Sequence, residues 1–333
     1  MFGKLLAPAC FAVGLASLTH AAFAQECGDV VIANMNWQSI DVLANIDKII
    51  LENGYGCSAE ITIGDTVSIM TSMVEKGEPD IAPEAWLNAL PEVVSRGVAE
   101  GKLISAGNAL SDGGIQGWYI PRYIADAHPE IKTVSDALKH PELFPAPEDS
   151  SKGAVVNGPS GWGASTTTSQ LYKAYEGDAK GFVLVDPGSA AGLDGSIAKN
   201  YERKIGWLGY YWSPTSLLGK YPMVKLNFDA THDAEEWKRC NTVADCDDPK
   251  VNDWPIDKVE TLVTRNFAER AGAAMDYLKV RRWDNATLNS LLAWMTDNQA
   301  TGEDAARYFL EKNPEIWKKW LSPEVAEKVK SSL

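Results

Sequence analysis

The sequence has little histidine and cysteine, and it lacks the motifs on which most enzyme and metal sites depend. Only 4 His and 5 Cys occur among its 333 residues. The G-x-S-x-G and G-x-G-x-x-G patterns, the P-loop and the usual zinc-binding spacings do not occur. His128, His140 and His232 stand beside proline or in an acidic loop, as surface residues typically do. We therefore expect no catalytic residue, no metal ion and no cofactor.

Positive charge is also scarce, and this limits the partners of the protein. The chain has 31 Lys and Arg against 45 Asp and Glu, a formal net charge of −14. Such an acidic surface disfavours nucleic acid and anionic membranes as partners. A small ligand remains possible, because the charges near a site outweigh the net charge.

Long apolar runs are missing after the first two dozen residues. The N-terminal stretch combines one lysine, a short apolar run and Ala22-Phe23-Ala24, which is typical of a secretory signal peptide. We expect residues 1–24 to be removed by cleavage near Ala24/Gln25. The mature protein is then expected to be a soluble, monomeric protein of the periplasm.

Four cysteines would remain once Cys10 leaves with the signal peptide. An even number in an exported protein favours two disulfides over a zinc site. Three pairings are possible. We favour Cys27–Cys57, because each precedes an expected strand, and Cys240–Cys246, because only a short polar loop separates them.

Strands and helices alternate along the chain, which predicts parallel α/β sheets. An amphipathic helix is expected after the first strand, ending at Gly54, and further helices are expected near 165–176 and 189–201. The C-terminal region reads as helical, with Trp317 and Trp320 in the core or packed on the surface. The expected strands cover 29–34, 59–64, 79–86, 153–158, 181–186, 204–212, 222–228 and 259–267.

Two such units, with the chain returning to the first, predict two lobes that face a cleft. We expect lobe I to comprise 25–117 and 221–333, and lobe II to comprise 118–220. The hinges are expected at the two crossings, near 117–121 and 218–222.

Four tryptophans follow expected strands at or just beyond their carboxyl ends. They are Trp37, Trp86, Trp162 and Trp212, two from each expected lobe. Ligands of open α/β sheets bind at these strand ends, whereas a single tryptophan more often fills a core. A set of indole faces attracts a diffuse, weakly hydrated cation such as a methylated ammonium group. We therefore expect a site for such a ligand between the lobes.

Polar groups near these rings could complete the site. Glu84 precedes Trp86 and could favour a cation when ionised or donate a hydrogen bond when protonated; the alternative is stabilisation of a helix N-terminus. Backbone N–H groups of Gly161, Trp162 or Gly163 could hold an anionic group, or form a plain strand-to-helix turn. The acidic stretch 245–253 lacks the spacing of a calcium-binding EF-hand.

The chain resembles periplasmic substrate-binding proteins of ABC importers for glycine betaine, proline betaine, choline and related osmolytes. The matching segments run in order through nearly the whole mature chain. They are "NMNW", "ILENGYGC", "GEPDIAPEAW", "GWYIPRY", "NGPSGWG", "LGYYWSPTSLLGKY" and the tryptophan-rich C-terminal region. Around the third tryptophan, many relatives have cysteine or proline where this chain reads "NGPSGWGAS".

The resemblance implies a bilobal type II fold, with two α/β lobes joined by two crossover strands, that closes on its ligand. It also implies that Trp37, Trp86, Trp162 and Trp212 form an aromatic box, and that the transmembrane subunits of an ABC permease are the partners. The ligand would be glycine betaine or a close relative. Trimethylamine N-oxide is an alternative, since the "EAW" form is similar to members that take it, and choline is another. A secreted enzyme acting on a methylated amine and a purely structural secreted protein are the alternatives of other classes.

Overall fold

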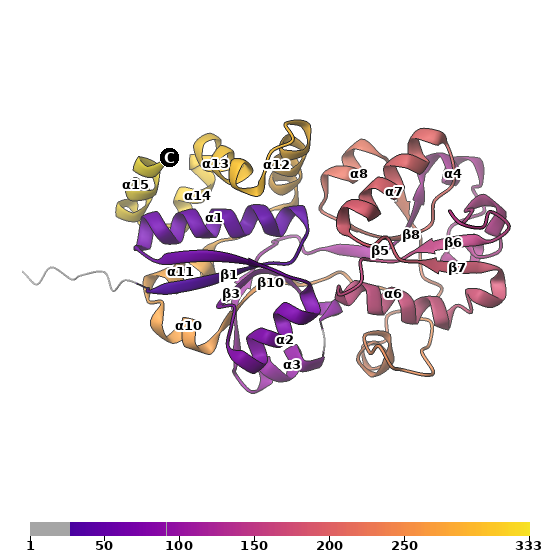
Figure 1. Cartoon of the computed structure of the whole chain (residues 1–333), viewed down its shortest axis with the longest axis horizontal. Coiled ribbons are helices and arrows are strands. Elements are labelled where there is room, and N and C mark those ends of the chain that lie inside the picture. The colour runs from indigo at the N-terminus through magenta and orange to yellow at the C-terminus, as the bar shows by residue number, and fades with distance from the viewer. Residues whose placement is uncertain (1–26, 91) are drawn as a thin grey trace, which may run out of the picture.

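The computed structural model describes residues 27–90 and 92–333. The expected signal peptide and its cleavage position lie outside the described residues. Within the described part of the chain, no helix is both long enough and apolar enough to cross a membrane. This part forms two α/β lobes that lie side by side (Figure 1).

Lobe I is built on a five-stranded sheet of order β2-β1-β3-β10-β4. β1 pairs in parallel with β2 and β3, whereas β10 runs antiparallel between β3 and β4. The expected parallel sheet is therefore mixed, because a strand that returns from the other lobe enters in the opposite direction. The strands are β1 (Asp29–Asn34), β2 (Ser58–Ile63), β3 (Ile81–Trp86), β4 (Leu103–Asn108) and β10 (Val259–Thr264).

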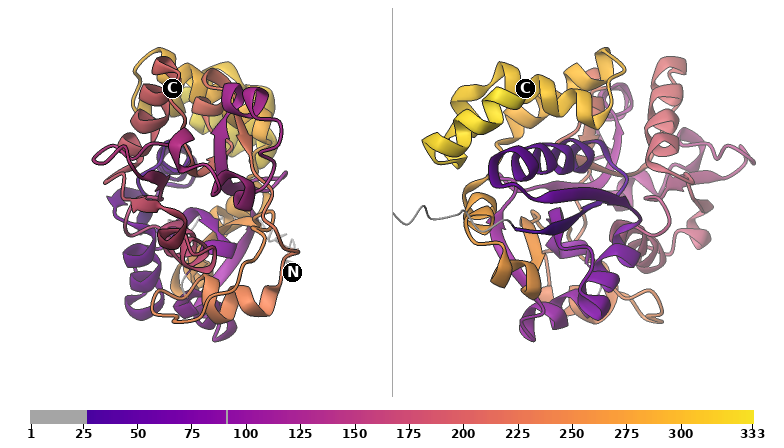
Figure 2. Two further views of the ribbon diagram at one scale, coloured as in Figure 1. Left: turned by 90° about the vertical axis from the view of Figure 1, so that its right-hand side faces the viewer. Right: turned by 60° about the vertical axis from the view of Figure 1, so that its left-hand side comes forward.

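Helices from both ends of the described chain cover the sheet of lobe I. The C-terminal helices α13 and α15 pack on α1, so the end of the chain completes the lobe that its beginning started (Figures 1 and 2). Trp317 and Trp320 lie buried in this region, in agreement with the core assignment. The helices are α1 (Gln38–Tyr55), α2 (Thr66–Lys76), α3 (Glu92–Ala99), α10 (Arg265–Arg270), α11 (Ala273–Val280), α12 (Asn285–Asp297), α13 (Gly302–Lys312), α14 (Pro314–Trp317) and α15 (Pro323–Ser332), with 3-10 turns at η1 (Leu87–Ala89) and η5 (Lys318–Trp320).

Helix α1 shows how the sequence pattern becomes structure. Its apolar residues recur at helical spacing, and Ile40, Leu43 and Ile50 are completely buried. The helix ends just before Gly56, which takes a left-handed φ of 71° and donates its N–H back to the last turn. The expected end at Gly54 is thus wrong by about one residue. Gly54 lies within the helix, where side chains of α15 leave no room for a Cβ.

Lobe II is built on a second mixed sheet, of order β7-β6-β8-β5-β9. The strand expected over 204–212 is shorter and begins only at Gly209. The strands are β5 (Ile115–Pro121), β6 (Gly153–Val156), β7 (Phe182–Val185), β8 (Gly209–Ser213) and β9 (Met223–Lys225). The helices are α4 (Arg122–Ala127), α5 (Val134–Ala137), α6 (Gly163–Ala174), α7 (Ala190–Arg203), α8 (Ser216–Lys220) and α9 (Ala234–Glu236), with single turns at η2 (Pro141–Leu143), η3 (Asp178–Lys180) and η4 (Trp237–Asn241).

The chain crosses between the two sheets twice. The first crossing lies between β4 and β5, over 109–114, and the second between β9 and β10, over 226–258. The two segments pair with each other, since Gly114 N–H donates to Asp257 O (2.9 Å) and Asp257 N–H donates to Gly114 O (2.7 Å).

These crossings correct the expected hinges. The region 117–121 lies inside β5, and 218–222 covers the end of α8 and the two residues before β9, so both lie within lobe II. The expected limit at 117 divides β5, and the expected limit at 220 assigns β9 to lobe I. β9 instead pairs with β5 in the sheet of lobe II, because a hydrophobic run does not reveal which sheet it joins. The exact limits of the lobes remain a prediction.

The structure contains both expected disulfides. Cys27–Cys57 links the beginnings of the neighbouring strands β1 and β2, with 5.1 Å between the Cα atoms. Cys240–Cys246 closes a short loop in the second crossing, with 5.3 Å between the Cα atoms. Each bond thus tightens a local connection rather than joining the two lobes.

Candidate ligand-binding site

Four tryptophans from the two lobes line one cavity of about 30 Å³. In lobe I, Trp37 immediately precedes α1 and Trp86 ends β3. In lobe II, Trp162 immediately precedes α6 and Trp212 lies near the end of β8. We call these four residues the tryptophan cage. The structure thus brings together the rings that the strand-end pattern singled out.

Three of the four cage rings contact one another edge to face. The Trp162 ring centroid lies 5.4 Å from that of Trp37 and 5.3 Å from that of Trp212, with interplanar angles of 78° in both pairs. Each of the four side chains is at most 9% exposed. Electron-rich faces in so dry a setting suit a diffuse cation that gives up its hydration easily.

Glu84 fixes both tryptophans of lobe I. Its Oε1 accepts hydrogen bonds from Trp37 Nε1 (3.0 Å), Trp86 Nε1 (2.9 Å) and Ser39 Oγ (2.9 Å). The side chain is fully buried within β3 and is not among the residues that line the cavity. Glu84 lies in β3 rather than in the first turn of a helix, but its partner Ser39 belongs to the first turn of α1, so the carboxyl group also lies near a helix N-terminus. Glu84 holds the two indoles from behind, and a direct contact with a ligand stays a prediction.

The charge of Glu84 is set by its buried surroundings. Burial raises the pKa of Glu84 to about 7, against the lowering effects of its three hydrogen bonds and of the Arg281 guanidinium. Arg281 is itself buried and pairs with Asp47, at 3.0 Å between Nε and Oδ1. Burial also raises the pKa of Asp47. An ionised Glu84 would place negative charge behind the cage and so favour a cation inside it.

Helix α6 begins at the cage. Gly163, its first residue, and Ala164 both line the cavity, so the positive end of the helix dipole lies beside the rings. The Trp162 N–H is occupied, because it donates to Pro159 O (3.1 Å) within the turn. Of the amides expected to hold an anionic group, that of Trp162 is therefore already bonded, whereas Gly163 is a residue of the cavity wall.

The glycines around Trp162 also bring the lobes together. Gly161 has a positive φ of 91°, and its carbonyl accepts a hydrogen bond from Val67 N–H of lobe I (3.1 Å). Gly163 packs so closely on the Ala89 carbonyl that a Cβ would overlap it. Bare backbone at these two positions thus allows the lobes to approach on either side of Trp162. Gly161 is not among the residues that line the cavity.

Three polar residues of the cavity wall, Thr66, Gln116 and Tyr210, were missed in the sequence. Tyr210 and Gln116 both line the cavity, and Tyr210 OH donates to Gln116 Oε1 (2.7 Å). Tyr210 could have been found, because it lies two residues before Trp212 and therefore shares its face of the strand. Gln116 gives no such signal, since its position opposite Trp212 arises from the pairing of β5 with β8.

A larger cavity of about 410 Å³ adjoins the cage and shares Trp37 and Trp212 with it. It lies between the lobes, and Asp41 of α1 and Asp194 of α7 are part of its wall. Burial raises the pKa of Asp194 to about 6, although the Tyr211 hydroxyl donates to it at 2.7 Å. Among the described residues, neither cavity is lined by a lysine or an arginine. The space next to the cage therefore favours cationic groups over anionic ones.

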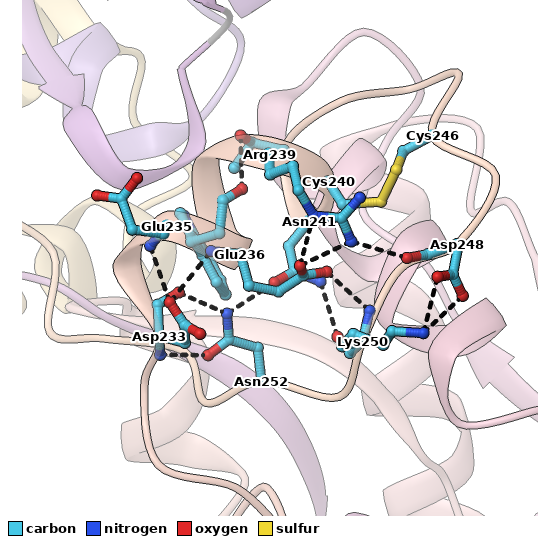
Figure 3. A network of polar contacts seen from close by, with 12 residues as sticks. Asp233, Glu235, Glu236, Arg239, Cys240, Asn241, Cys246, Asp248, Lys250 and Asn252 are labelled. Atoms are coloured by element: carbon cyan, nitrogen blue, oxygen red, sulfur yellow. Dashed lines mark hydrogen bonds and ion pairs between the residues drawn. A yellow bond between two sulfur atoms is a disulfide. The ribbon is translucent and has the colours of Figure 1, made fainter.

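The acidic loop near 245–253 shares a polar network with residues of α9 and η4 (Figure 3). Lys250 Nζ contacts the Asp248 carboxylate at 2.7 Å, and Arg239 Nη2 contacts Glu236 Oε2 at 2.7 Å. Within the described residues, no group of three His, Cys, Asp or Glu side chains is arranged to hold a metal ion. The segment just before the loop packs on α6, because Gln170 Nε2 donates to the backbone carbonyls of Val243 and Ala244.

Comparison with known proteins connects this geometry to a family. The model of the OpuAC family, described as the substrate binding domain of ABC-type glycine betaine transport systems, matches residues 28–312. The trimethylamine N-oxide-binding protein of Pelagibacter ubique is 22% identical over 312 residues, which cover 92% of this chain and 94% of that protein.

Solved structures share the bilobal type II periplasmic binding protein fold. A glycine betaine, L-proline-binding protein (ProX) from Borrelia burgdorferi matches with a TM-score of 0.70 at 21% identity, over 90% of this chain and 99% of its own. A choline-binding protein of an ABC transporter, solved in complex with choline, matches with a TM-score of 0.71 at 15% identity, over 92% and 98%. Because the family model matches most of its length, the chain belongs to the OpuAC family of ABC-transporter substrate-binding domains, and it is a binding protein rather than an enzyme.

Proposed function

We propose that this protein is the periplasmic receptor of an ABC importer and that its tryptophan cage holds the methylated ammonium head of a small osmolyte. The convergence of four indole rings from two lobes on one cavity carries this proposal. Closure of the lobes around the ligand would create the form that the transmembrane subunits of the permease recognise. The receptor is proposed to act as a monomer.

The cage can supply the required affinity. A cation over an indole face contributes about 0.5–2 kcal/mol per ring. Burial of each methyl group adds roughly 0.8 kcal/mol. Three or four ring contacts together with three buried methyl groups therefore approach about −8 kcal/mol, the free energy of micromolar binding.

The surroundings of the cage favour a ligand without a free carboxylate. The space adjoining the cage carries Asp41 and Asp194 but no lysine or arginine among the described residues. The start of α6 at Gly163 suits an oxygen attached directly to the ammonium nitrogen. We therefore rank trimethylamine N-oxide first, ahead of choline and glycine betaine, and the relative from Pelagibacter ubique supports this order.

A titration panel tests both parts of the proposal. Purified protein is titrated calorimetrically with trimethylamine N-oxide, choline, glycine betaine, proline betaine and carnitine, and small-angle scattering follows the radius of gyration. We expect micromolar binding of at least one compound, accompanied by a fall in radius of gyration and by no product. Binding of none of them would contradict the receptor function, and tightest binding of glycine betaine would contradict the ligand order alone.

A further inference from the structure

A buried carboxylate in the second crossing contacts both lobes. Asp257 is 1% exposed. Its Oδ1 accepts a hydrogen bond from the Asn88 N–H of lobe I (2.9 Å), and its Oδ2 accepts one from Gln116 Nε2 of lobe II (2.5 Å). Asn88 adds a second contact with the crossing, since its Nδ2 donates to Ile256 O (3.0 Å). One side chain therefore joins the two lobes at the place where the chain passes between them.

A short path of hydrogen bonds leads from Asp257 to the cage. Gln116, which bonds Asp257, accepts through Oε1 from Tyr210 OH (2.7 Å), and both residues line the cage cavity. The Tyr210 ring stacks on the ring of Trp212, with 6.1 Å between centroids and an interplanar angle of 18°. The ring of Trp212 is thus connected to Asp257 through the side chains of Tyr210 and Gln116.

A second path runs through the backbone. Gly114 of the first crossing exchanges two hydrogen bonds with the backbone of Asp257. The same glycine lies against the six-membered ring of Trp86, so closely that a Cβ would overlap ring atoms. The crossing that carries Asp257 therefore touches a cage ring of lobe I as well as the polar wall from lobe II.

We propose that Asp257 is a positioning residue that couples occupancy of the tryptophan cage to closure of the lobes; this inference rests on the proposed function. A ligand in the cage would pack against Trp86, which Glu84 already orients, and against Tyr210. These residues in turn fix Gly114 and Gln116, which hold the backbone and the side chain of Asp257. The same carboxylate also accepts a hydrogen bond from Asn88 of lobe I. The arrangement in which both lobes are bonded to Asp257 is therefore also the one in which the cage is complete.

Burial makes this coupling sensitive to the loss of a single bond. Desolvation raises the pKa of Asp257 to about 7, opposed by the hydrogen bonds from Asn88 and Gln116. A buried polar group that loses its partner costs more than an ordinary hydrogen bond contributes. Opening of the lobes, which separates Asn88 from Gln116, would break one of the two bonds.

Two substitutions at Asp257 separate coupling from simple structural support. Asp257→Ala removes both acceptors and should raise the Kd for trimethylamine N-oxide, choline or glycine betaine at least tenfold while abolishing the ligand-dependent fall in radius of gyration. Asp257→Asn should stay within threefold of the parent. The introduced side-chain oxygen still accepts from the Asn88 N–H. The introduced amide N–H can donate to Gln116 Oε1 if the Gln116 side-chain amide flips. Gln116 Nε2 then faces Tyr210 and donates to its hydroxyl oxygen. Glu260→Gln, a buried carboxylate on β10 paired with Lys258, serves as the matched control and should change neither quantity.

The experiment uses calorimetry for affinity and small-angle scattering for closure, with the full mature chain. An Asp257→Ala variant that binds and closes like the parent overturns the inference. If that variant does not fold, Tyr210→Phe decides, because it keeps the ring and removes only the hydroxyl; it should weaken binding at least threefold, and unchanged affinity and closure would overturn the inference. A parent protein that binds none of the five compounds of the titration panel contradicts the proposed function itself, which distinguishes the two failures.

Discussion

The two lobes hold their halves of the tryptophan cage in different ways. In lobe I, Trp37 and Trp86 both donate their indole N–H groups to Glu84. In lobe II, within the part of the chain that the structure describes, the indole N–H groups of Trp162 and Trp212 donate to no other residue. Trp212 is instead packed among aromatic rings, with its centroid 4.6 Å from that of Tyr211.

This difference separates a fixed wall from an adaptable one. Hydrogen bonds to a buried carboxylate are directional and hold each indole in one orientation. Ring contacts tolerate small shifts at little cost. Lobe I is therefore expected to define where the ligand head binds, and lobe II to adjust to its shape during closure.

Removal of the ring that joins the two walls should have the largest effect. Trp162 contacts Trp37 of the fixed wall and Trp212 of the adaptable one. Trp162→Ala should weaken ligand binding at least tenfold in a calorimetric titration, a loss of about 1.4 kcal/mol or more. Trp294→Ala, which removes a ring stacked on Tyr308 outside the cage, is the control and should leave the Kd unchanged. A Trp162→Ala variant that binds as tightly as the parent would remove Trp162 from the site.

Loss of the acceptor behind the fixed wall should have the next largest effect. Glu84→Leu leaves two indole N–H groups without their partner and should weaken binding about five- to tenfold. Glu84→Gln retains an acceptor oxygen but removes the charge, so its effect should be only a few-fold. Comparison of the two Kd values separates orientation of the rings from electrostatic attraction. Equal effects of both substitutions would show that charge alone matters.

A pair of phenylalanine substitutions compares the walls directly. Phenylalanine keeps a ring face but has no N–H group. Trp37→Phe should therefore weaken binding about fivefold, because the bond to Glu84 is lost. Trp212→Phe should weaken it only two- to threefold, because its neighbours can repack around a smaller ring. A larger effect at Trp212 than at Trp37 would reverse the assignment of the two walls.

The last prediction concerns the stability of the protein without ligand rather than its affinity. The Glu84 pKa of about 7 in the folded protein lies above its ordinary value of 4.5. The unfolded chain therefore releases this proton near pH 4.5, whereas the folded chain keeps it until about pH 7. The contribution of Glu84 to stability is thus fully present below pH 4.5 and is lost as the pH rises to 7.

Urea unfolding of the parent and of Glu84→Gln across this range measures the effect. The free energy of unfolding of the parent, relative to that of the variant, should decline between pH 4.5 and 7 and stay constant above pH 7. Groups common to both proteins, such as Asp194 and Asp257, cancel in the difference. A difference that does not vary with pH would show that Glu84 is ionised throughout in the folded state.

The sequence was sufficient to locate the cage rings but not to explain how they are held. Strand-end positions beside glycine and proline pointed to Trp37, Trp86, Trp162 and Trp212, because the strand order of a parallel unit brings such ends together. The role of Glu84 required the structure, since its partners come from β3 and from the start of α1. A carboxylate two residues before a tryptophan does not reveal that it bonds a second indole.

Features that depend on pairing between distant segments could not be predicted. Gln116 and Asp257 meet only because the two crossings run side by side. The hinges were misplaced because β9 joins the second sheet. The three residues of β9 carry no pattern that indicates which sheet this strand extends. Local signals, such as the disulfide of Cys240 with Cys246, were read correctly because the two ends lie close in the sequence.

The most direct test of the central claim replaces the ammonium nitrogen of the ligand by carbon. Trimethylamine N-oxide is compared with tert-butanol, and choline with 3,3-dimethylbutan-1-ol, by calorimetric titration of the parent protein. Each pair has nearly the same shape. Choline and its carbon analogue differ only in the positive charge, whereas trimethylamine N-oxide and tert-butanol differ also in the oxygen, which is an oxide in the first and a hydroxyl in the second, so the choline pair decides. If the four indole faces recognise a cation, each ammonium compound that binds should do so at least tenfold more tightly than its carbon counterpart. Equal or tighter binding of the carbon compounds would show that the rings form an ordinary apolar pocket.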